Sequence, residues 1–220
     1  MQTDLRENNC ITLIGEVSSD FKFSHEVFGE KFYTFYLNTE RLSKTIDSLP
    51  VTISERLIDK NILKIGALIE IKGQIRSYNN IIDKKNHLVL SVFVKDINFN
   101  LNESKNPNLV TLNGFLCKTP VYRKTPFGRE ITDILLAVNR SYNKSDYIPC
   151  ITWGRNAKFT NNIEIGENII ITGRMQSRKY QKKLETGDII EKVAYEVSVS
   201  KLQIVKDNEI KNELNYDELD

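Results

Sequence analysis

Apolar and polar residues alternate along several stretches of the chain. Between residues 69 and 76, apolar side chains recur as Ile69, Ile71 and Ile75 with polar residues between them, and residues 169–176 repeat the pattern. Residues 88–94 and 194–200 alternate in the same way. A period of two residues is typical of strands that bury one face, so the chain is predicted to consist mainly of β-strands.

The alternating stretches belong to an internal repeat. The segment ITLIGEV at 11–17 corresponds to VTLNGFL at 110–116, an offset of 99 residues, and residues 65–77 correspond to 165–177 at an offset of 100. The offset of 99 also relates Gly29 to Gly128, Arg41 to Arg140 and Pro50 to Pro149. A repeat of this length predicts two copies of one domain, which we place at residues 1–104 and 105–206.

Each copy is predicted to form a small closed barrel. A glycine interrupts the same strand in both copies, as Gly73 and Gly173, and suits the sharp bend that such a barrel needs. Residues 53–65 and 154–165 have helical potential. Five strands with a short helix between the third and fourth are the plan of an OB-fold, so we predict an all-β protein of two tandem OB-fold barrels. A β-sandwich would show more and shorter strands.

Two polar segments lie outside the barrel pattern. Residues 100–108 are predicted to link the copies. Residues 207–220 hold six acidic residues and one lysine, few apolar side chains and no alternation, so we expect an acidic, disordered tail.

Charge is divided unevenly along the chain, although the net charge is only +2. Residues 1–104 contain 13 Lys and Arg against 14 Asp and Glu, whereas residues 105–206 contain 17 against 9. A basic domain attracts polyanions, because each phosphate that it neutralises releases a condensed counterion. The second copy is therefore the candidate for nucleic-acid binding.

Other classes of function find little support in the residue types. Cys10, Cys117 and Cys150 are far apart and are expected to remain thiols, and neither His25 nor His87 has metal-ligand spacing. We therefore predict no metal, no cofactor and no enzymatic activity, since paired carboxylates, a nucleophile with its base and a phosphate-binding glycine loop are not recognisable. Without an apolar run of membrane-spanning length or a signal-like start, the protein is expected in the cytoplasm.

The segment DYIPCITWGR at 146–155 raises the question of which face of a strand carries its rings. Alternation places Tyr147 and Trp153 on one face and Ile148 and Cys150 on the other. The rings could fill the core or face outward. Arginines and aromatic residues alternate in the second copy, and this composition is typical of grooves that hold a single strand by charge and stack its bases. An ordinary solvated surface is the alternative interpretation.

The second copy, from residue 108 to 205, resembles bacterial single-stranded DNA-binding proteins. The resemblance rests on VTLNGFL, LLAVNRSY, DYIPCITWGRNA and IITGRMQSRKY. It implies a non-catalytic protein that binds single-stranded DNA in replication, recombination or repair. It also implies that bases stack on four rings and that nearby cations hold the phosphates. The rings are Tyr142, Tyr147, Trp153 and Tyr180, and the cations are Arg123, Lys124, Arg129, Arg140, Arg155, Arg174, Arg178 and Lys179.

The first copy departs from this pattern. Serine or asparagine stands at all four ring positions, as Ser43, Ser48, Ser54 and Asn80. Its own rings, Phe32, Tyr33, Phe35 and Tyr36, fall in one strand, where core packing is the expected role. We therefore predict weak strand binding, an architectural role or contact with a protein partner for this copy.

Partners are predicted from the same resemblance. Typical members assemble four OB-folds, so a chain with two implies a homodimer, and the first copy or the acidic tail could bind replication or repair proteins. The tail ends in NYDELD instead of the family's apolar motif, which places that docking in question. The alternatives are an accessory or adaptor protein of a primosome, plasmid or phage, and an RNA-binding module.

Overall fold

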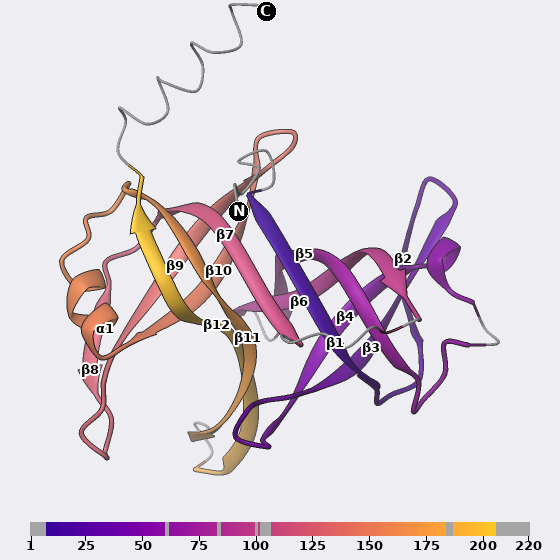
Figure 1. Ribbon diagram of the computed structural model, residues 1–220, viewed down its shortest axis with the longest axis horizontal. Coiled ribbons are helices and arrows are strands. Elements are labelled where there is room, and N and C mark those ends of the chain that lie inside the picture. Colours follow the sequence, from indigo (N-terminus) through magenta and orange to yellow (C-terminus); the bar gives the residue numbers. More distant parts are fainter. Residues whose placement is uncertain are drawn as a thin grey trace, which may run out of the picture.

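Two β-barrels lie side by side in the computed structural model, which describes residues 8–59, 62–82, 85–99, 101, 107–183 and 187–205 (Figure 1). Most of the predicted linker and the predicted acidic tail lie outside these residues. Residues 8–101 form one barrel, called here the first half, and residues 107–205 form the other, the second half. None of the helices in the described ranges is both long and apolar enough to cross a membrane.

The strands of the first half follow the alternation of the sequence. In chain order they are β1 (Asn9–Val17), β2 (Lys22–Val27), β3 (Glu30–Glu40), β4 (Ile46–Ser54), β5 (Leu68–Ile82) and β6 (Lys85–Asn98), with a 3₁₀ helix η1 (Glu55–Leu57) between β4 and β5.

The second half repeats the same order of elements. Its strands are β7 (Asn108–Leu116), β8 (Val121–Lys124), β9 (Glu130–Arg140), β10 (Lys144–Trp153), β11 (Asn168–Lys183) and β12 (Ile189–Ile204), and helix α1 (Arg155–Thr160) lies between β10 and β11.

Strand pairing closes each half into a barrel. In the first half the order is β3, β4, β6, β5 and β1, and a pairing of β1 with β3 completes the circle; β9, β10, β12, β11 and β7 do the same in the second half. The pairs β4–β6 and β10–β12 are parallel, and the others are antiparallel. This arrangement confirms the prediction of an all-β, OB-fold chain.

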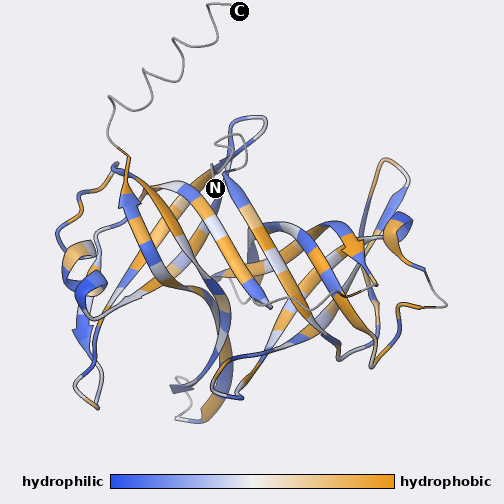
Figure 2. Cartoon of the chain, viewed as in Figure 1, coloured by the Kyte–Doolittle hydropathy of each residue, from blue (hydrophilic) through white to orange (hydrophobic). Residues whose placement is uncertain are grey.

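The core of each barrel is filled by the apolar positions of the alternating strands. Ile69, Ile71 and Ile75 are fully buried, as are Ile169 and Met175. Figure 2 shows the result as bands of hydrophobic and hydrophilic residues that alternate along β1, β7 and β11.

Two features differ from the sequence prediction. Each half has a sixth strand, β2 or β8, which forms a hairpin with the strand that follows it. In the first half the predicted helix is reduced to η1 within the described residues, whereas α1 forms in the second half. Ala157 of α1 is small enough to let the helix lie close to the barrel and is fully buried, while η1 buries none of its residues.

The halves are joined by a shared sheet. Strands β1 and β7 pair antiparallel, with Ile11 opposite Val110, and they run next to each other at the centre of Figure 1. Two asparagines at the ends of this pairing, Asn9, which is buried, and Asn108, which is partly buried, make equivalent hydrogen bonds to the neighbouring strand. The Asn9 side chain bonds both backbone groups of Ile75, and the Asn108 side chain bonds those of Met175.

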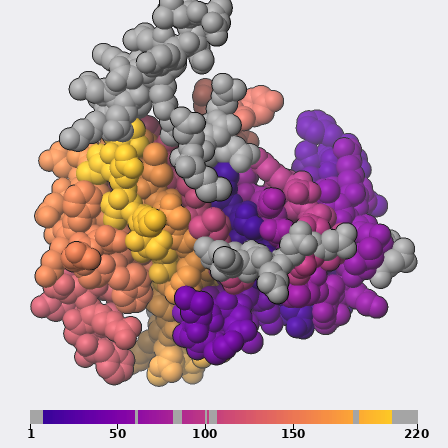
Figure 3. Space-filling view, in the orientation of Figure 1, coloured from indigo at the N-terminus to yellow at the C-terminus, as the bar shows by residue number. Residues whose placement is uncertain are grey.

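Two carboxylates link the halves in a symmetric way. Asp47 of the first half accepts hydrogen bonds from the backbone N–H of Ser177 and from Arg41, and Asp146 of the second half accepts them from the backbone N–H of Ser77 and from Arg140. In Figure 3 the violet surface of the first half meets the orange surface of the second at the lower edge of the molecule. The two barrels are therefore related by an approximate twofold axis.

Candidate nucleic-acid interface

A hollow of about 500 Å³ on the second half brings together many of the predicted site residues. We call it the Trp153 groove. Its lining includes one ring, five arginines and one carboxylate: Trp153, Arg41, Arg123, Arg129, Arg174, Arg178 and Glu196. Four of the arginines come from the second half, and Arg41 comes from the first.

Trp153 points outward because of the alternation along β10. Ile148 and Cys150 are buried in the barrel, and burial raises the pKa of the Cys150 thiol. Trp153 and Tyr147, on the opposite face, are 37% and 45% exposed. The indole Nε1 of Trp153 donates a hydrogen bond of 3.2 Å to Ser198 Oγ. The ring is thus held in place while part of it remains open to a ligand.

Arg178 and Glu196 form the mixed-charge part of the groove. The Arg178 guanidinium contacts both carboxylate oxygens of Glu196, at 3.4 and 3.3 Å, and lies 6.0 Å from the centre of the Tyr180 ring. Glu196 is 5% exposed and also accepts a hydrogen bond from Gln176. Glu196 therefore neutralises part of the positive charge in the groove.

Arg174 and Arg41 share the buried carboxylate of Asp47. Burial of Asp47 opposes its ionisation, but the hydrogen bonds from Arg41 and Ser177 outweigh it and lower the pKa of this carboxyl. Burial lowers the pKa of Arg174, and the positive charge of Arg41 lowers it further. The negative charge of Asp47 raises it, but by less. Within the described chain the buried Arg174 Nη1 lacks a hydrogen-bond partner and lies 3.7 Å from Asp47 Oδ2.

Four further predicted cations form ion pairs or are exposed, and of these Arg123 alone lines the groove. Arg123 forms a two-point ion pair with Asp133, which is the main cause of its raised pKa. Lys179 contacts Glu191 at 3.1 Å. Lys124 on β8 and Arg155 on α1 are exposed.

Three predicted residues lie apart from the Trp153 groove. One is Tyr147, which is outside the groove lining and whose backbone N–H donates a hydrogen bond to Ser77 Oγ of the first half. Arg140 and Tyr142 line a separate hollow of about 990 Å³, together with Lys144 of the second half and several residues of the first. We call it the Tyr78 groove. Tyr142 is 94% exposed and has a positive φ of 63°, on the turn between β9 and β10 that extends to the first half. The first-half lining includes His25, Tyr36, Arg76, Ser77, Tyr78 and Phe93.

The structure corrects one expectation about the rings of the first half. Phe35 is buried, as predicted, but Tyr36 is 43% exposed and lines the Tyr78 groove. Alternation along β3 explains the difference, since neighbouring residues of a strand point to opposite faces. Phe32 and Tyr33 are partly buried.

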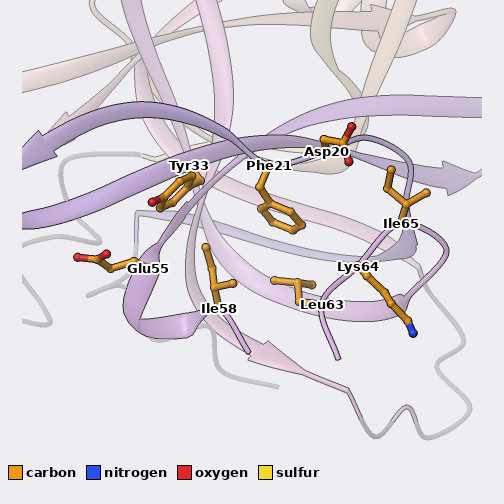
Figure 4. A pocket seen from close by; sticks show the side chains of 8 residues that line it. All are labelled: Asp20, Phe21, Tyr33, Glu55, Ile58, Leu63, Lys64 and Ile65. Carbon is orange, nitrogen blue, oxygen red and sulfur yellow. The ribbon is translucent and has the colours of Figure 1, made fainter. Parts of the chain in front are cut away.

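A third hollow, of about 470 Å³, lies on the first half beside η1 (Figure 4). Phe21, Ile58 and Leu63 point toward one another in it, and the Lys64 amine points away. Residue 58 corresponds to Ala157 of the second half, so this hollow lies where α1 packs in the other barrel.

Comparison of the sequence with known proteins identifies a family. A profile described as the single-strand binding protein family matches residues 107–205. Single-stranded DNA-binding protein 2 of Listeria innocua is 30% identical over 121 residues, which cover 50% of this chain and 76% of that protein. The chain belongs to the single-strand binding protein family.

A second family member, the single-stranded DNA-binding protein of Clostridium tetani, is 40% identical over 83 residues, or 34% of this chain and 57% of its own length. The chain spans about half the length of the first curated relatives that it matches.

Most of the chain has a counterpart in fold among solved structures. The wild-type single-stranded DNA binding protein from Thermus aquaticus aligns with 90% of this chain and 93% of its own, with a TM-score of 0.70 and 19% identity. At this identity the likeness shows the fold alone.

Two charged residues of the Trp153 groove, Arg41 and Glu196, are absent from the predicted site. The sequence identifies Arg41 as a cation that the first copy retains, but its place in the groove depends on how the halves pack. Glu196 belongs to an alternating strand and carried no separate signal, although a carboxylate between apolar positions could have been noted.

Proposed function

We propose that the chain binds single-stranded DNA in the Trp153 groove without catalysing a reaction. Trp153 would stack a base inside the groove, and Tyr147 and Tyr180, which lie outside its lining, would stack further bases of the strand. Arg123, Arg129, Arg174 and Arg178 would hold phosphates, with Lys124, Arg155 and Lys179 extending the positive surface. The observation that carries this proposal is the partly exposed Trp153 ring in a hollow lined by five arginines. Because every base has a π face, such a groove binds with little sequence preference.

Family membership supports the same function. The relatives found by comparison are named for binding single-stranded DNA. We place the activity in DNA replication, recombination or repair, in the cytoplasm. We also propose a homodimer with four barrels, for which sedimentation equilibrium should give a mass of twice 25.4 kDa.

The test uses the only tryptophan of the chain as its own probe. Titration of the full chain with an oligothymidylate should quench Trp153 fluorescence. In a fluorescence anisotropy assay with a labelled oligomer, Trp153→Ala should weaken binding by about 1–3 kcal/mol, the usual contribution of one stacked base. Affinity should also fall steeply as salt rises.

Phe159→Ala is the matched control, because this ring is 50% exposed on α1 and lines none of the three hollows described above. If Trp153→Ala binds as tightly as the wild type and the wild type shows no quenching, the Trp153 groove is not the binding site. A matched oligouridylate in the same assay identifies an RNA-binding protein if it binds more tightly than the DNA.

A further inference from the structure

The Tyr78 groove of the first half has the charge and rings of a strand-binding surface. No Asp or Glu is among its lining residues within the described chain, whereas three cations are: Arg76, Arg140 and Lys144. Arg76 and Arg140 both contact the buried Asp146, at 3.1 and 3.0 Å. Two guanidinium groups on one carboxylate leave a net positive charge, and exposed Lys144 adds to it.

The groove lacks the acidic residue of its counterpart. Ser91 pairs with Arg76 on β5 as Glu196 pairs with Gln176 on β11, so Ser91 takes the place of Glu196. Ser91 hydrogen-bonds Thr52 at 2.6 Å and carries no charge. In the Trp153 groove, Glu196 neutralises part of the charge of Arg178. A phosphate in the Tyr78 groove therefore meets no carboxylate at the corresponding position.

The aromatic residues around the Tyr78 groove stand at positions next to the one that Trp153 occupies in the second half. Ser54 takes the place of Trp153, but Phe32 pairs with Ser54 where Ile131 pairs with Trp153. Phe93 likewise takes the place of Ser198, the hydrogen-bond partner of Trp153. The first half therefore lacks a ring at Ser54 but has rings at the two neighbouring positions, Phe32 and Phe93.

These rings form a connected cluster that ends at the surface. His25 lies parallel to Phe32, with ring centroids 4.9 Å apart and an interplanar angle of 8°, and Phe32 lies 5.6 Å from Phe93. His25 is exposed, and Tyr78, which also lines the groove, is 57% exposed. The open face of an anchored ring is the kind of platform on which a base stacks.

We propose that the Tyr78 groove is a second site for single-stranded DNA, with His25 and Tyr78 as its base-stacking rings. The second half would complete it with Tyr142 and the cations Arg140 and Lys144. The inference rests on the proposed function of the Trp153 groove, because it extends the bound strand from one half to the other. The substitutions that seemed to remove strand binding from the first half would instead have moved its rings.

The experiment compares a short and a long oligothymidylate on the full chain. About 8 nucleotides suffice for one barrel, and about 30 can cover two. The double variant His25→Ala/Tyr78→Ala should bind the short oligomer and quench Trp153 as the wild type does. It should bind the long oligomer at least about 5-fold more weakly, since one stacked base contributes that much or more. Fewer nucleotides should be bound per chain at saturation.

Phe159→Ala should leave both oligomers unaffected, and thermal melting confirms that the exposed substitutions keep the fold. Unchanged affinity and stoichiometry for the long oligomer in the double variant would overturn the second site. The failure of the proposed function is a different result, namely a short oligomer that leaves Trp153 fluorescence of the wild type unchanged. A long oligomer that still depends on His25 and Tyr78 would then support the second site alone.

Discussion

Glu196 shows how one side chain sets the charge of a groove. It is almost fully buried, accepts hydrogen bonds from Gln176 and Arg178, and lines the Trp153 groove. A phosphate that enters this groove must compete with the carboxylate for Arg178. Because charged groups at a binding surface affect both affinity and its salt dependence, Glu196 should weaken DNA binding.

Replacing Glu196 by glutamine should therefore tighten binding. The amide keeps the shape and an acceptor oxygen but removes the charge, so Arg178 becomes available to the strand. We expect affinity for oligothymidylate to rise by about 1 kcal/mol, the upper range for an ion pair near the surface, because the Arg178 side chain is 46% exposed although Glu196 is buried. The slope of log affinity against log salt should become steeper by about one unit, if one more phosphate contact forms. Fluorescence anisotropy at several salt concentrations measures both.

Glu164→Gln is the matched control. Glu164 is an exposed carboxylate of the second half and lies outside the lining of the Trp153 groove. If Glu196→Gln binds more weakly than the wild type while the control does not change, the carboxylate must position Arg178 for the strand instead of competing for it.

At the residue scale, the sequence predicts which face of a strand a side chain occupies better than it predicts which distant residues surround that side chain. Alternation along a strand predicted that Trp153 and Tyr147 lie on the face opposite Ile148 and Cys150, because the period of two is a local property. It could not predict that Tyr142 lines a hollow of the first half. That position depends on the packing of two barrels, which the local pattern does not encode.

At the element scale, Gly73 and Gly173 allow the long strands to bend. Each lies at a register shift of its ladder, next to Lys72 and Thr172 respectively. A Cβ on Gly173 would lie 2.3 Å from the Ser198 carbonyl oxygen, and one on Gly73 would lie 2.1 Å from that of Phe93. The absence of a side chain is therefore required by the close approach of two backbones.

Gly173→Ala should destabilise the second half. The Ser198 backbone must move to make room for the methyl group, and this displacement should lower the free energy of unfolding by about 1–3 kcal/mol, as for other overpacked sites. Urea denaturation followed by circular dichroism gives the value. Because Ser198 holds Trp153, the fluorescence spectrum of the folded variant should shift as well.

Thr172→Ala, one residue away, is the control. The Thr172 side chain is only partly buried, and this position already carries a Cβ atom. Equal stability of Gly173→Ala and the wild type would mean that the strands can separate locally without cost, and the bend would not depend on glycine.

Elements were predicted well where burial and periodicity coincide and less well elsewhere. The strands around Ile71 and Ile171 follow from alternation alone. The helix after the third strand of each barrel does not, since η1 and α1 differ mainly in whether a small residue such as Ala157 permits close packing. Short hairpin strands such as β2 (Lys22–Val27) are exposed along their whole length and so lack a burial pattern.

At the scale of the whole molecule, Asp47 ties the two barrels together and should make stability depend on pH. Its folded-state pKa is lowered because the hydrogen bonds from Arg41 and Ser177 outweigh the opposing effect of burial. A lowered carboxyl pKa contributes stability that is fully present above the unfolded-state value and lost as pH falls through the folded-state value. The free energy of unfolding should thus decrease as pH falls below about 4.

The variant Asp47→Asn should remove part of this pH dependence. It should also lower the free energy of unfolding at pH 7 by about 3 kcal/mol, because Arg41 and Arg174 lose the buried carboxylate that they share. Chemical denaturation at a series of pH values measures both effects. Asp20→Asn serves as the control on an exposed carboxylate. If Asp47→Asn shows the full acid dependence of the wild type, other carboxylates cause it.

The pairing of β1 with β7 has a consequence for how such a chain can evolve. When identical subunits form a barrel pair, every substitution appears in both barrels at once. Here the two barrels are encoded separately and held together in one polypeptide, so a change such as Trp to Ser at one ring position affects a single groove. Two barrels within one chain can therefore change independently, so that one keeps a set of contacts while the other acquires a different one.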